Sequence, residues 1–308
     1  MQEKSAQAIT SSVEPPNQTP SLWEVVGAFA SLTKPRILPL VIFSGTPALV
    51  MATGGWPEPR FAFLVLLGIA IAAAAANTLN CYIERDLDAK MVRTSSRPLP
   101  SARLAPTSAL VFGLSLSLVA VIVLYQVGGP LAAGLGVASI LFYVFVYTIW
   151  LKPRSTWNAV VGGAAGAAAP LIADAAVSGT VGAPGWLLFA IIFFWQPPHV
   201  WAIALFRKAD YQAAGIPMLP NKIGDQPTRW QMLWYTVGLV PITFAPVALG
   251  FLGMVYAIPA VLLNFWFVWQ SVRVLREQDD ASARRMFQVS LVYLFALFSF
   301  MLLDLALV

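Results

Sequence analysis

The residues best suited to chemistry lie at the end of one apolar segment, where amide and carboxylate side chains recur at helical spacing. Asn77, Asn80, Glu84 and Asp88 share a stripe about 80° wide if a helix, which turns roughly 100° per residue, continues to residue 88. Asp86 then points to the opposite side. Carboxylate and amide oxygens are hard ligands of the kind that Mg²⁺ takes together with water and substrate phosphate. The chain has one Cys and one His, so no cluster competes for zinc. The spacing therefore predicts a Mg²⁺ site.

Several cations accompany these carboxylates. Arg85, Arg93 and Arg97 follow them directly, and Lys152 and Arg154 occupy a later polar loop. Metal-binding carboxylates beside many cations indicate a third, anionic group, and a diphosphate bridged by Mg²⁺ would satisfy both. The alternative is an ordinary charged helix end at a membrane interface.

A second candidate group follows a later apolar segment. His199, the only histidine, lies within that segment, and it shares a face with Asp210 if one helix continues through both. Lys208 and Tyr211 flank Asp210. An imidazole can ligate iron or transfer protons near neutral pH, or simply pack, and the sequence leaves these roles open.

The segments that carry these residues are long and apolar. The chain of 308 residues is 58% hydrophobic and 11% charged, whereas soluble proteins contain about a quarter charged residues. A helix that crosses a membrane needs about 20 apolar residues. We therefore expect an all-α, polytopic bundle of about nine transmembrane helices near residues 36–54, 61–83, 106–126, 130–150, 157–177, 185–206, 232–251, 254–272 and 287–307.

The placement of charge predicts topology. The net charge of +5 does not indicate nucleic acid, because nearly all Lys and Arg fall on one side of the predicted bundle and Arg60 alone falls on the other. By the positive-inside rule the N-terminus is cytoplasmic, in a bacterial-type inner membrane. Residues 1–34 are polar and resemble neither a signal nor a transit peptide, so we expect a flexible cytoplasmic tail before one transmembrane domain at 35–308. Cys81 is the only cysteine, which excludes an intramolecular disulfide.

Two polar loops on the predicted cytoplasmic side, 84–105 and 207–231, are related in pattern. Each places acidic residues before a proline-containing stop, Pro98-Leu-Pro100 or Pro217-Met-Leu-Pro220. The similarity predicts a weak internal repeat with a site shared between two halves.

A resemblance to a known family accounts for both groups. Asn80-x-x-x-Glu84-x-x-x-Asp88 resembles the N-x-x-x-D-x-x-x-D motif of the UbiA-type intramembrane prenyltransferases, with Glu84 in place of the first Asp. Longer strings resemble the heme O synthase branch of that family and cover about residues 33 to 300. They are Lys34-Pro-Arg36, Asn80-Cys-Tyr-Ile-Glu-Arg-Asp-Leu-Asp88, Arg97-Pro-Leu-Pro100, Leu151-Lys-Pro-Arg154, Pro197-Pro-His-Val-Trp201 and Asp210-Tyr-Gln-Ala-Ala-Gly215-Ile-Pro-Met-Leu-Pro220.

The chain departs from the family pattern at two places. Quinone-type relatives have a second D-x-x-x-D in the later loop, but Phe206 stands four residues before Asp210, so the second carboxylate pair is incomplete. Asp174 lies in an apolar span where relatives of the heme O synthase branch tend to have Gly-Trp.

The resemblance implies transfer of a farnesyl group from farnesyl diphosphate to a vinyl group of heme B, which makes heme O for heme-copper terminal oxidases. It implies that Asn80, Glu84, Asp88 and Asp210 bind Mg²⁺ and act in catalysis with His199. It also implies a lipid bilayer as environment and a heme A synthase or terminal oxidase assembly factor as partner. Substrate-binding side chains are expected at Asn77, Tyr82, Arg85, Arg93, Arg97, Lys152, Arg154, Lys208 and Tyr211, with Tyr82, Phe206 and Tyr211 shielding an allylic cation.

Two alternatives remain open. A prenyltransferase acting on an aromatic quinone precursor would be favoured by a complete D-x-x-x-D at 206–210, which this chain lacks. An ion-coupled transporter would spread carboxylates across the membrane depth, and Asp174 alone supports it.

Overall fold

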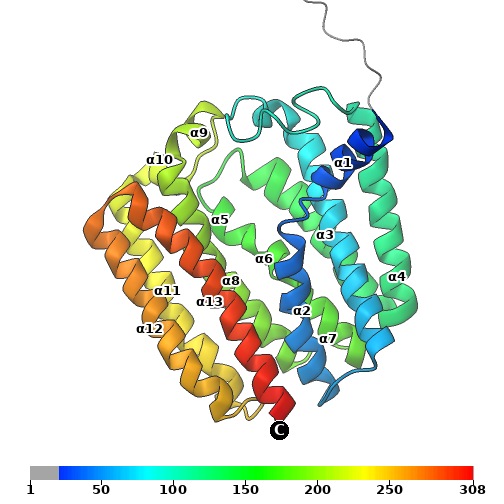
Figure 1. The fold of residues 1–308 in the computed structure, drawn as a ribbon, viewed down its shortest axis with the longest axis vertical. Helices are drawn as coiled ribbons and strands as arrows, with labels where there is room; N and C mark the ends of the chain where they lie inside the picture. Colours follow the sequence, from blue (N-terminus) through cyan, green and yellow to red (C-terminus); the bar gives the residue numbers. More distant parts are fainter. Residues whose placement is uncertain (1–20, 308) are drawn as a thin grey trace, which may run out of the picture.

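The computed structural model describes residues 21–307, and every regular element in that range is a helix (Figure 1). The all-α class predicted from the sequence is therefore confirmed. In chain order the elements are α1 (Leu22–Leu32), α2 (Leu38–Thr53), α3 (Pro59–Asp88), α4 (Pro106–Leu141), the π-helix η1 (Phe142–Leu151), α5 (Asn158–Val161), α6 (Gly163–Gly166), α7 (Ala168–Ser178), α8 (Ala183–Phe206), α9 (Lys208–Ala213), α10 (Leu219–Ile223), α11 (Asp225–Ala248), α12 (Met254–Glu277) and α13 (Asp280–Leu307).

Within the described range, seven helical stretches are long and apolar enough to cross a membrane. The continuous stretch Pro106–Leu151 counts once by this measure, and α2 is too short to count at 16 residues. Each of the nine predicted segments coincides with helix, but the number of nine crossings is not confirmed.

Helix α4 folds back on itself at Gly129, where φ is 78° and ψ is −177°. Only glycine adopts this backbone conformation readily, and Pro130 starts the second arm with a fixed φ. The arms pack together, because a Cβ atom on Gly136 would lie 2.7 Å from the Leu124 side chain. The predicted segments 106–126 and 130–150 are thus the two arms of one hairpin, the second continuing into η1.

Small residues bring α3 close to this hairpin. A Cβ atom on Gly68 would lie 2.7 Å from Leu124, and one on Gly113 would lie 2.8 Å from Leu79. An alanine run, of which Ala72, Ala74 and Ala75 are buried, continues the same close packing along α3. Small residues allow helix backbones to approach closely in membranes, and here they fix α3 against its neighbours.

Helix α1 revises the predicted tail. Ser21 and Glu24 form a reciprocal capping box that starts a helix, and Ala28 and Leu32 are buried in a small core with Leu104 and others. Residues 22–32 of the predicted tail are thus helical, while residues 1–20 lie outside the described range.

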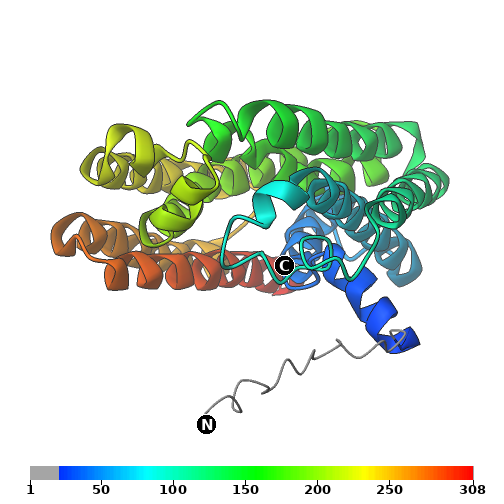
Figure 2. The same ribbon diagram turned by 90° about the horizontal axis from the view of Figure 1, so that it is seen from above.

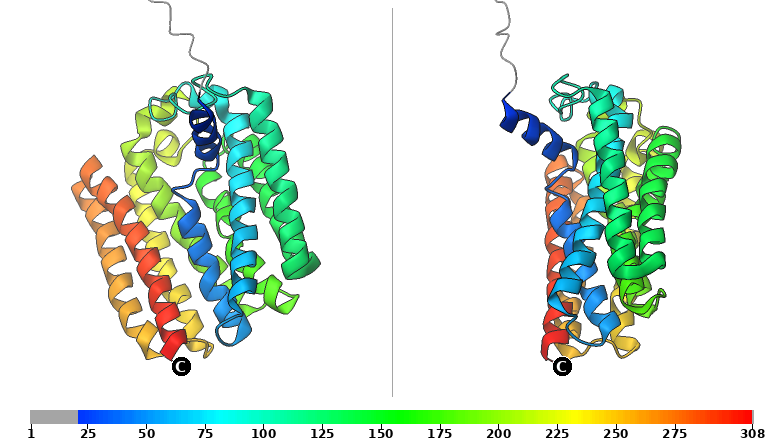
Figure 3. Two further views of the ribbon diagram at one scale, coloured as in Figure 1. Left: turned by 45° about the vertical axis from the view of Figure 1, so that its right-hand side comes forward. Right: turned by 90° about the vertical axis from the view of Figure 1, so that its right-hand side faces the viewer.

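The polar segments gather at one end of the bundle, which we call the loop end. It carries α1, the segment 89–105 that follows α3, and helices α9 and α10, whereas the C-terminus lies at the opposite end (Figure 1). Seen from above, the long helices surround the middle of the molecule (Figure 2), and α1 projects from the side of the bundle (Figure 3).

Candidate active site

The predicted stripe of polar residues forms the last turns of α3. The helix continues to Asp88, so Asn80, Glu84 and Asp88 share a face, and they are 1%, 3% and 1% exposed. Asp86 points away, with 84% of its side chain exposed. The predicted stripe required a helix that continues to residue 88, and α3 does so.

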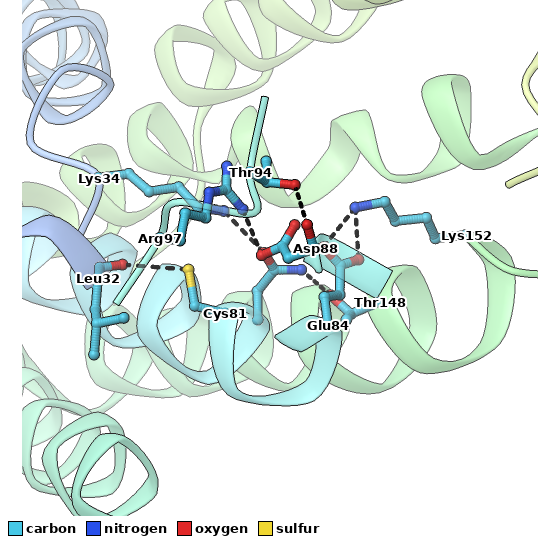
Figure 4. A network of polar contacts seen from close by, with 10 residues as sticks. Leu32, Lys34, Cys81, Glu84, Asp88, Thr94, Arg97, Thr148 and Lys152 are labelled. Atoms are coloured by element: carbon cyan, nitrogen blue, oxygen red, sulfur yellow. Dashed lines mark hydrogen bonds and ion pairs between the residues drawn. The ribbon is translucent and has the colours of Figure 1, made fainter. Parts of the chain in front are cut away.

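Three cations from different segments reach this stripe (Figure 4). Lys152 Nζ lies 2.6 Å from the Glu84 carboxylate, and Arg97 Nη1 donates to Asp88 Oδ2 at 2.7 Å. Lys34 Nζ donates to Asn80 Oδ1 at 2.8 Å. Lys34 and Lys152 lie 46 and 68 residues from their partners in the sequence, so the tertiary fold creates this network.

Further hydrogen bonds fix the orientation of the stripe. Asn80 Nδ2 donates to Thr148 Oγ1 at 3.0 Å, and Thr148 donates to the Tyr143 carbonyl within η1 at 2.8 Å. Thr94 Oγ1 donates to the Asp88 carbonyl at 2.8 Å, which folds the following loop over the helix end. These hydrogen bonds hold the side chains of the stripe and the following loop in one arrangement.

The charge balance of the network favours an anion. Three cations face two carboxylates, and all five groups are largely removed from water. Burial lowers the pKa of Lys34, because the ammonium loses hydration. Burial also acts to lower the pKa of Arg97, but Asp88 outweighs it and raises that pKa. A diphosphate would supply the missing negative charge.

The donor set suits Mg²⁺ completed by substrate. In the described part of the chain, no three His, Cys, Asp or Glu side chains come together to hold a metal. Glu84 and Asp88 with the Asn80 amide supply two carboxylates and one carbonyl oxygen, and Mg²⁺ typically takes one or two carboxylates, waters and substrate phosphate. The residues present therefore fit the ion as a substrate-bridged site.

A cavity of about 710 Å³ lies beside the network. It is mostly apolar, and its polar lining includes Asn77 of α3, Arg36, Asn158 of α5, and Gln196 and His199 of α8. Tyr147 joins the two regions, since its ring lines the cavity and lies 5.7 Å from Lys152 Nζ. Tyr143, Trp195 and Phe287 add aromatic walls.

His199 faces this cavity in a defined orientation. Its ring stacks on Trp195 with centroids 4.6 Å apart, and its Nδ1 lies 2.7 Å from Ser290 Oγ. Ser290 donates its hydroxyl hydrogen to the Phe287 carbonyl at 2.6 Å, so His199 Nδ1 is the donor to Ser290. Nε2 then carries the lone pair, available to a ligand, a metal or a proton.

Asp210 does not share a helix with His199, so the condition for a common face is not met. Helix α8 ends at Phe206, because Arg207 leaves the helical region at φ −118° and ψ 23°, and Asp210 belongs to α9. Its Oδ2 is buried without a hydrogen-bond partner, and Arg207 is 3.8 Å away. Among the residues described, no hydrogen bond or ion pair connects Asp210 to α3.

The two loop-end segments nevertheless meet. Met91, just after α3, is buried against Ala204, Ala214, Ile216 and Met218. This contact brings the segments that carry Asp88 and Asp210 together at the loop end.

Several expected substrate-binding residues lie elsewhere. Tyr82 packs against the core of α1 and lies under Arg85 at 5.0 Å. Arg93 is exposed, and Arg154 donates to carbonyl oxygens at the end of η1. Lys208 and Tyr211 are also absent from the cavity lining: Lys208 pairs with Asp225 at 2.7 Å, and Tyr211 packs against the Met91 cluster. Phe206, expected to shield the cation, packs against Phe287 outside the lining.

Asp174 has a structural task at the far end of the bundle. It is 2% exposed, and its Oδ2 accepts hydrogen bonds from the backbone N–H groups of Gly182 and Gly185 at 2.8 and 2.9 Å. These groups lie at the start of α8, so Asp174 caps that helix. Asp304 does the same for α12 through Gly253 and Tyr256.

Sequence reasoning did not assign Lys34, Thr148, Asn158 or Gln196 to the site. Lys34 could have been found from the sequence, because Lys34-Pro-Arg36 is one of the strings that resemble the family. Thr148 and Gln196 lie in apolar runs where one polar residue carries no spacing pattern.

The chain matches the UbiA prenyltransferase family over residues 40–298 and belongs to that family. It is therefore a prenyltransferase, as the resemblance predicted. It is 46% identical to protoheme IX farnesyltransferase of Acidiphilium cryptum, with 92% of each chain covered, and 45% identical to the enzyme of the same name from Rhodopseudomonas palustris strain BisB18, with 91% of this chain and 90% of that one.

Solved structures agree on the fold. A structure described as digeranylgeranylglyceryl phosphate synthase in membranes has a TM-score of 0.77 at 16% identity, covering 92% of this chain and all of that chain. A UbiA homolog from Archaeoglobus fulgidus bound to DMAPP and Mg²⁺ has a TM-score of 0.62 at 14% identity, covering 91% and 99%.

Proposed function

We propose that this prenyltransferase transfers the farnesyl group of farnesyl diphosphate to a vinyl group of heme B and so makes heme O. The observation that carries the proposal is the buried Asn80–Glu84–Asp88 stripe with its three cations beside a cavity of about 710 Å³. A cavity of this size and apolarity suits a hydrophobic substrate. The names of the relatives at 43–46% identity support the choice of substrates.

In this proposal the stripe binds the diphosphate. Mg²⁺ held by Asn80, Glu84 and Asp88 would neutralise charge that develops on the leaving group. Lys34, Arg97 and Lys152 would turn from the side chains they now contact toward diphosphate oxygens, and Asp210 would approach from the other loop. Preplaced cations stabilise the departing diphosphate more than the intact substrate.

The cavity walls hold the reacting carbons. Tyr143, Tyr147, Trp195 and Phe287 line the cavity with aromatic rings, which would stabilise an allylic cation. His199 would take part through Nε2, as a ligand of heme iron or as a proton acceptor.

The proposal places the protein in a bacterial inner membrane with the loop end in the cytoplasm, where farnesyl diphosphate would arrive. Heme O would pass to a heme A synthase or a terminal oxidase assembly factor. The transporter alternative loses its supporting residue, because Asp174 caps α8.

The test is a defined reaction. Purified full-length protein in detergent is mixed with heme B, farnesyl diphosphate and MgCl₂, and the product is identified by mass spectrometry. We expect heme O, and EDTA should abolish it. No farnesylated heme, or prenylation of an aromatic acid offered with a longer diphosphate instead, would overturn the proposal.

A further inference from the structure

Gln196 is a polar residue of the cavity whose side chain has no hydrogen-bond partner among the described residues. It lies on α8 and lines the cavity, and its Oε1 is fully enclosed without a partner. Burying a polar atom without a partner is costly, roughly 1–3 kcal/mol, so the fold holds this amide in place at a cost. The amide nitrogen is not among the enclosed atoms and is the part of Gln196 that can bind a ligand.

The fold makes room for this amide. A Cβ atom at either Gly163 or Gly166 would collide with the Gln196 side chain, so the amide rests directly on the backbone of α6. Because Oε1 is enclosed there, the amide nitrogen is the polar atom that Gln196 presents to the cavity. The fold therefore fixes a hydrogen-bond donor in an apolar space.

Gln196 and His199 face the cavity together. They are three residues apart on α8, so their side chains are neighbours on one helix face. His199 keeps Nδ1 on Ser290, which leaves Nε2 as an acceptor. Asn158, 2% exposed, lines the same cavity with its Nδ2 buried and unpartnered. A donor on Gln196 and an acceptor on His199, both on one helix face toward the cavity, match the needs of one bound water.

We propose that Gln196 is a positioning residue that holds the water molecule which completes heme farnesylation, with His199 Nε2 accepting its proton. This inference rests on the proposed function. Accepting a hydrogen bond from Gln196 and donating one to His199 leaves the water one lone pair with which to attack.

The chemistry balances with water as the only co-reactant. The vinyl π pair forms a bond from the terminal vinyl carbon to farnesyl C1, while the C1–O bond breaks and the diphosphate leaves with its electron pair. Positive charge moves to the vinyl carbon attached to the porphyrin ring. The water oxygen bonds to that carbon, and one water proton passes to His199 Nε2. The same cation can instead lose a proton from the adjacent carbon and give an alkene.

The competition between these two fates gives the test. Full-length Gln196→Leu and Gln196→Met variants are assayed with heme B, farnesyl diphosphate and Mg²⁺ in ¹⁸O-labelled water, and hydroxylated and alkenyl products are separated by mass. Gln270→Leu is the matched control, since Gln270 is an amide 2% exposed in α12 that donates to the Ser282 carbonyl away from the cavity. Heme B absorbance and the gel-filtration profile report folding.

We expect the alkene share to rise about tenfold in the Gln196 variants, because the attacking water loses a hydrogen bond, and to stay at the wild-type level in the control. A wild-type share of ¹⁸O-hydroxylated product in the Gln196 variants would overturn the inference. So would folded variants that transfer no farnesyl group, since Gln196 would then act in transfer itself. A wild-type protein that makes no farnesylated heme would instead overturn the proposed function.

Discussion

Glu84 and Lys152 are two residues whose charges depend on each other. Their side chains are 4% and 16% exposed and lie 2.6 Å apart. Removing one partner of a buried pair typically costs about 3–5 kcal/mol, because the other charge is left uncompensated.

Glu84→Ala should therefore lose both stability and turnover. In the double variant Glu84→Gln/Lys152→Met, neither buried charge remains, so most of the thermal stability should return. Turnover should not return, because one carboxylate of the proposed metal site is still missing. Melting temperature in detergent and heme O formation measure the two effects separately. A double variant that turns over near the wild-type rate would remove Glu84 from the metal site.

The structure orients the His199 ring through Trp195 and Ser290, which the sequence did not predict. His199→Phe keeps the stacking on Trp195 and should lower turnover by about 100-fold or more, the range of a lost acid–base group. Ser290→Ala should have a smaller effect, since it removes only the hydrogen bond that keeps the His199 proton on Nδ1. Turnover and the absorbance spectrum of bound heme B are the readouts, and a wild-type rate with an unchanged spectrum would mean that His199 only packs.

The sequence predicted the residues of one stripe and two of the cations that reach it, Arg97 and Lys152, but not the groups that contact Asn80. Asn80, Glu84 and Asp88 follow from helical periodicity alone, because they lie on one helix. Lys34 and Thr148 approach Asn80 from 46 and 68 residues away, and local spacing carries no record of such contacts.

At the scale of elements, the prediction and the structure are best compared at the ends of helices. The break predicted at 127–129, between the segments 106–126 and 130–150, is the turn of the α4 hairpin. The end of α8 at Phe206 matches the end of the predicted span 185–206, but the residue types did not show whether the helix continues into the loop, since Arg207 is compatible with a helix. The face shared by His199 and Asp210 depended on that continuation, and it is absent.

Asp174 gives a prediction at the element scale. Asp174→Ala should lower the free energy of unfolding by about 1–2 kcal/mol, because the first turn of α8 loses its acceptor. Turnover per folded molecule should not change. Thermal melting and a heme O assay on the folded fraction check this, with Asp304→Ala as a parallel cap at α12. Loss of turnover in a fully folded Asp174 variant would show that the residue serves the reaction.

At the scale of the whole molecule, the candidate site lies at one end of the bundle and structural carboxylates lie at the other. The stripe, its cations and the segments around Asp210 lie toward the loop end, while Asp174 and Asp304 cap helices at the other (Figure 1). This separation agrees with the charge asymmetry in the sequence, which predicts that the loop end is cytoplasmic.

Cysteine labelling tests that orientation. Cys81 is buried and is the only cysteine, so Cys81→Ser gives a clean background. Ser95→Cys at the loop end and Thr180→Cys at the other end introduce single exposed thiols. A membrane-impermeant maleimide added to intact cells with a permeable outer membrane should label the variant at 180 and spare the variant at 95. The reverse pattern would invert the proposed topology.

The most direct test of the account is a crystal structure of the protein with Mn²⁺ in place of Mg²⁺ and a non-hydrolysable farnesyl diphosphate analogue. We predict an anomalous peak bounded by Asn80, Glu84 and Asp88, with Lys152 and Arg97 moved onto diphosphate oxygens. An analogue bound elsewhere, with no peak at α3 and both carboxylates still paired to their cations, would contradict it.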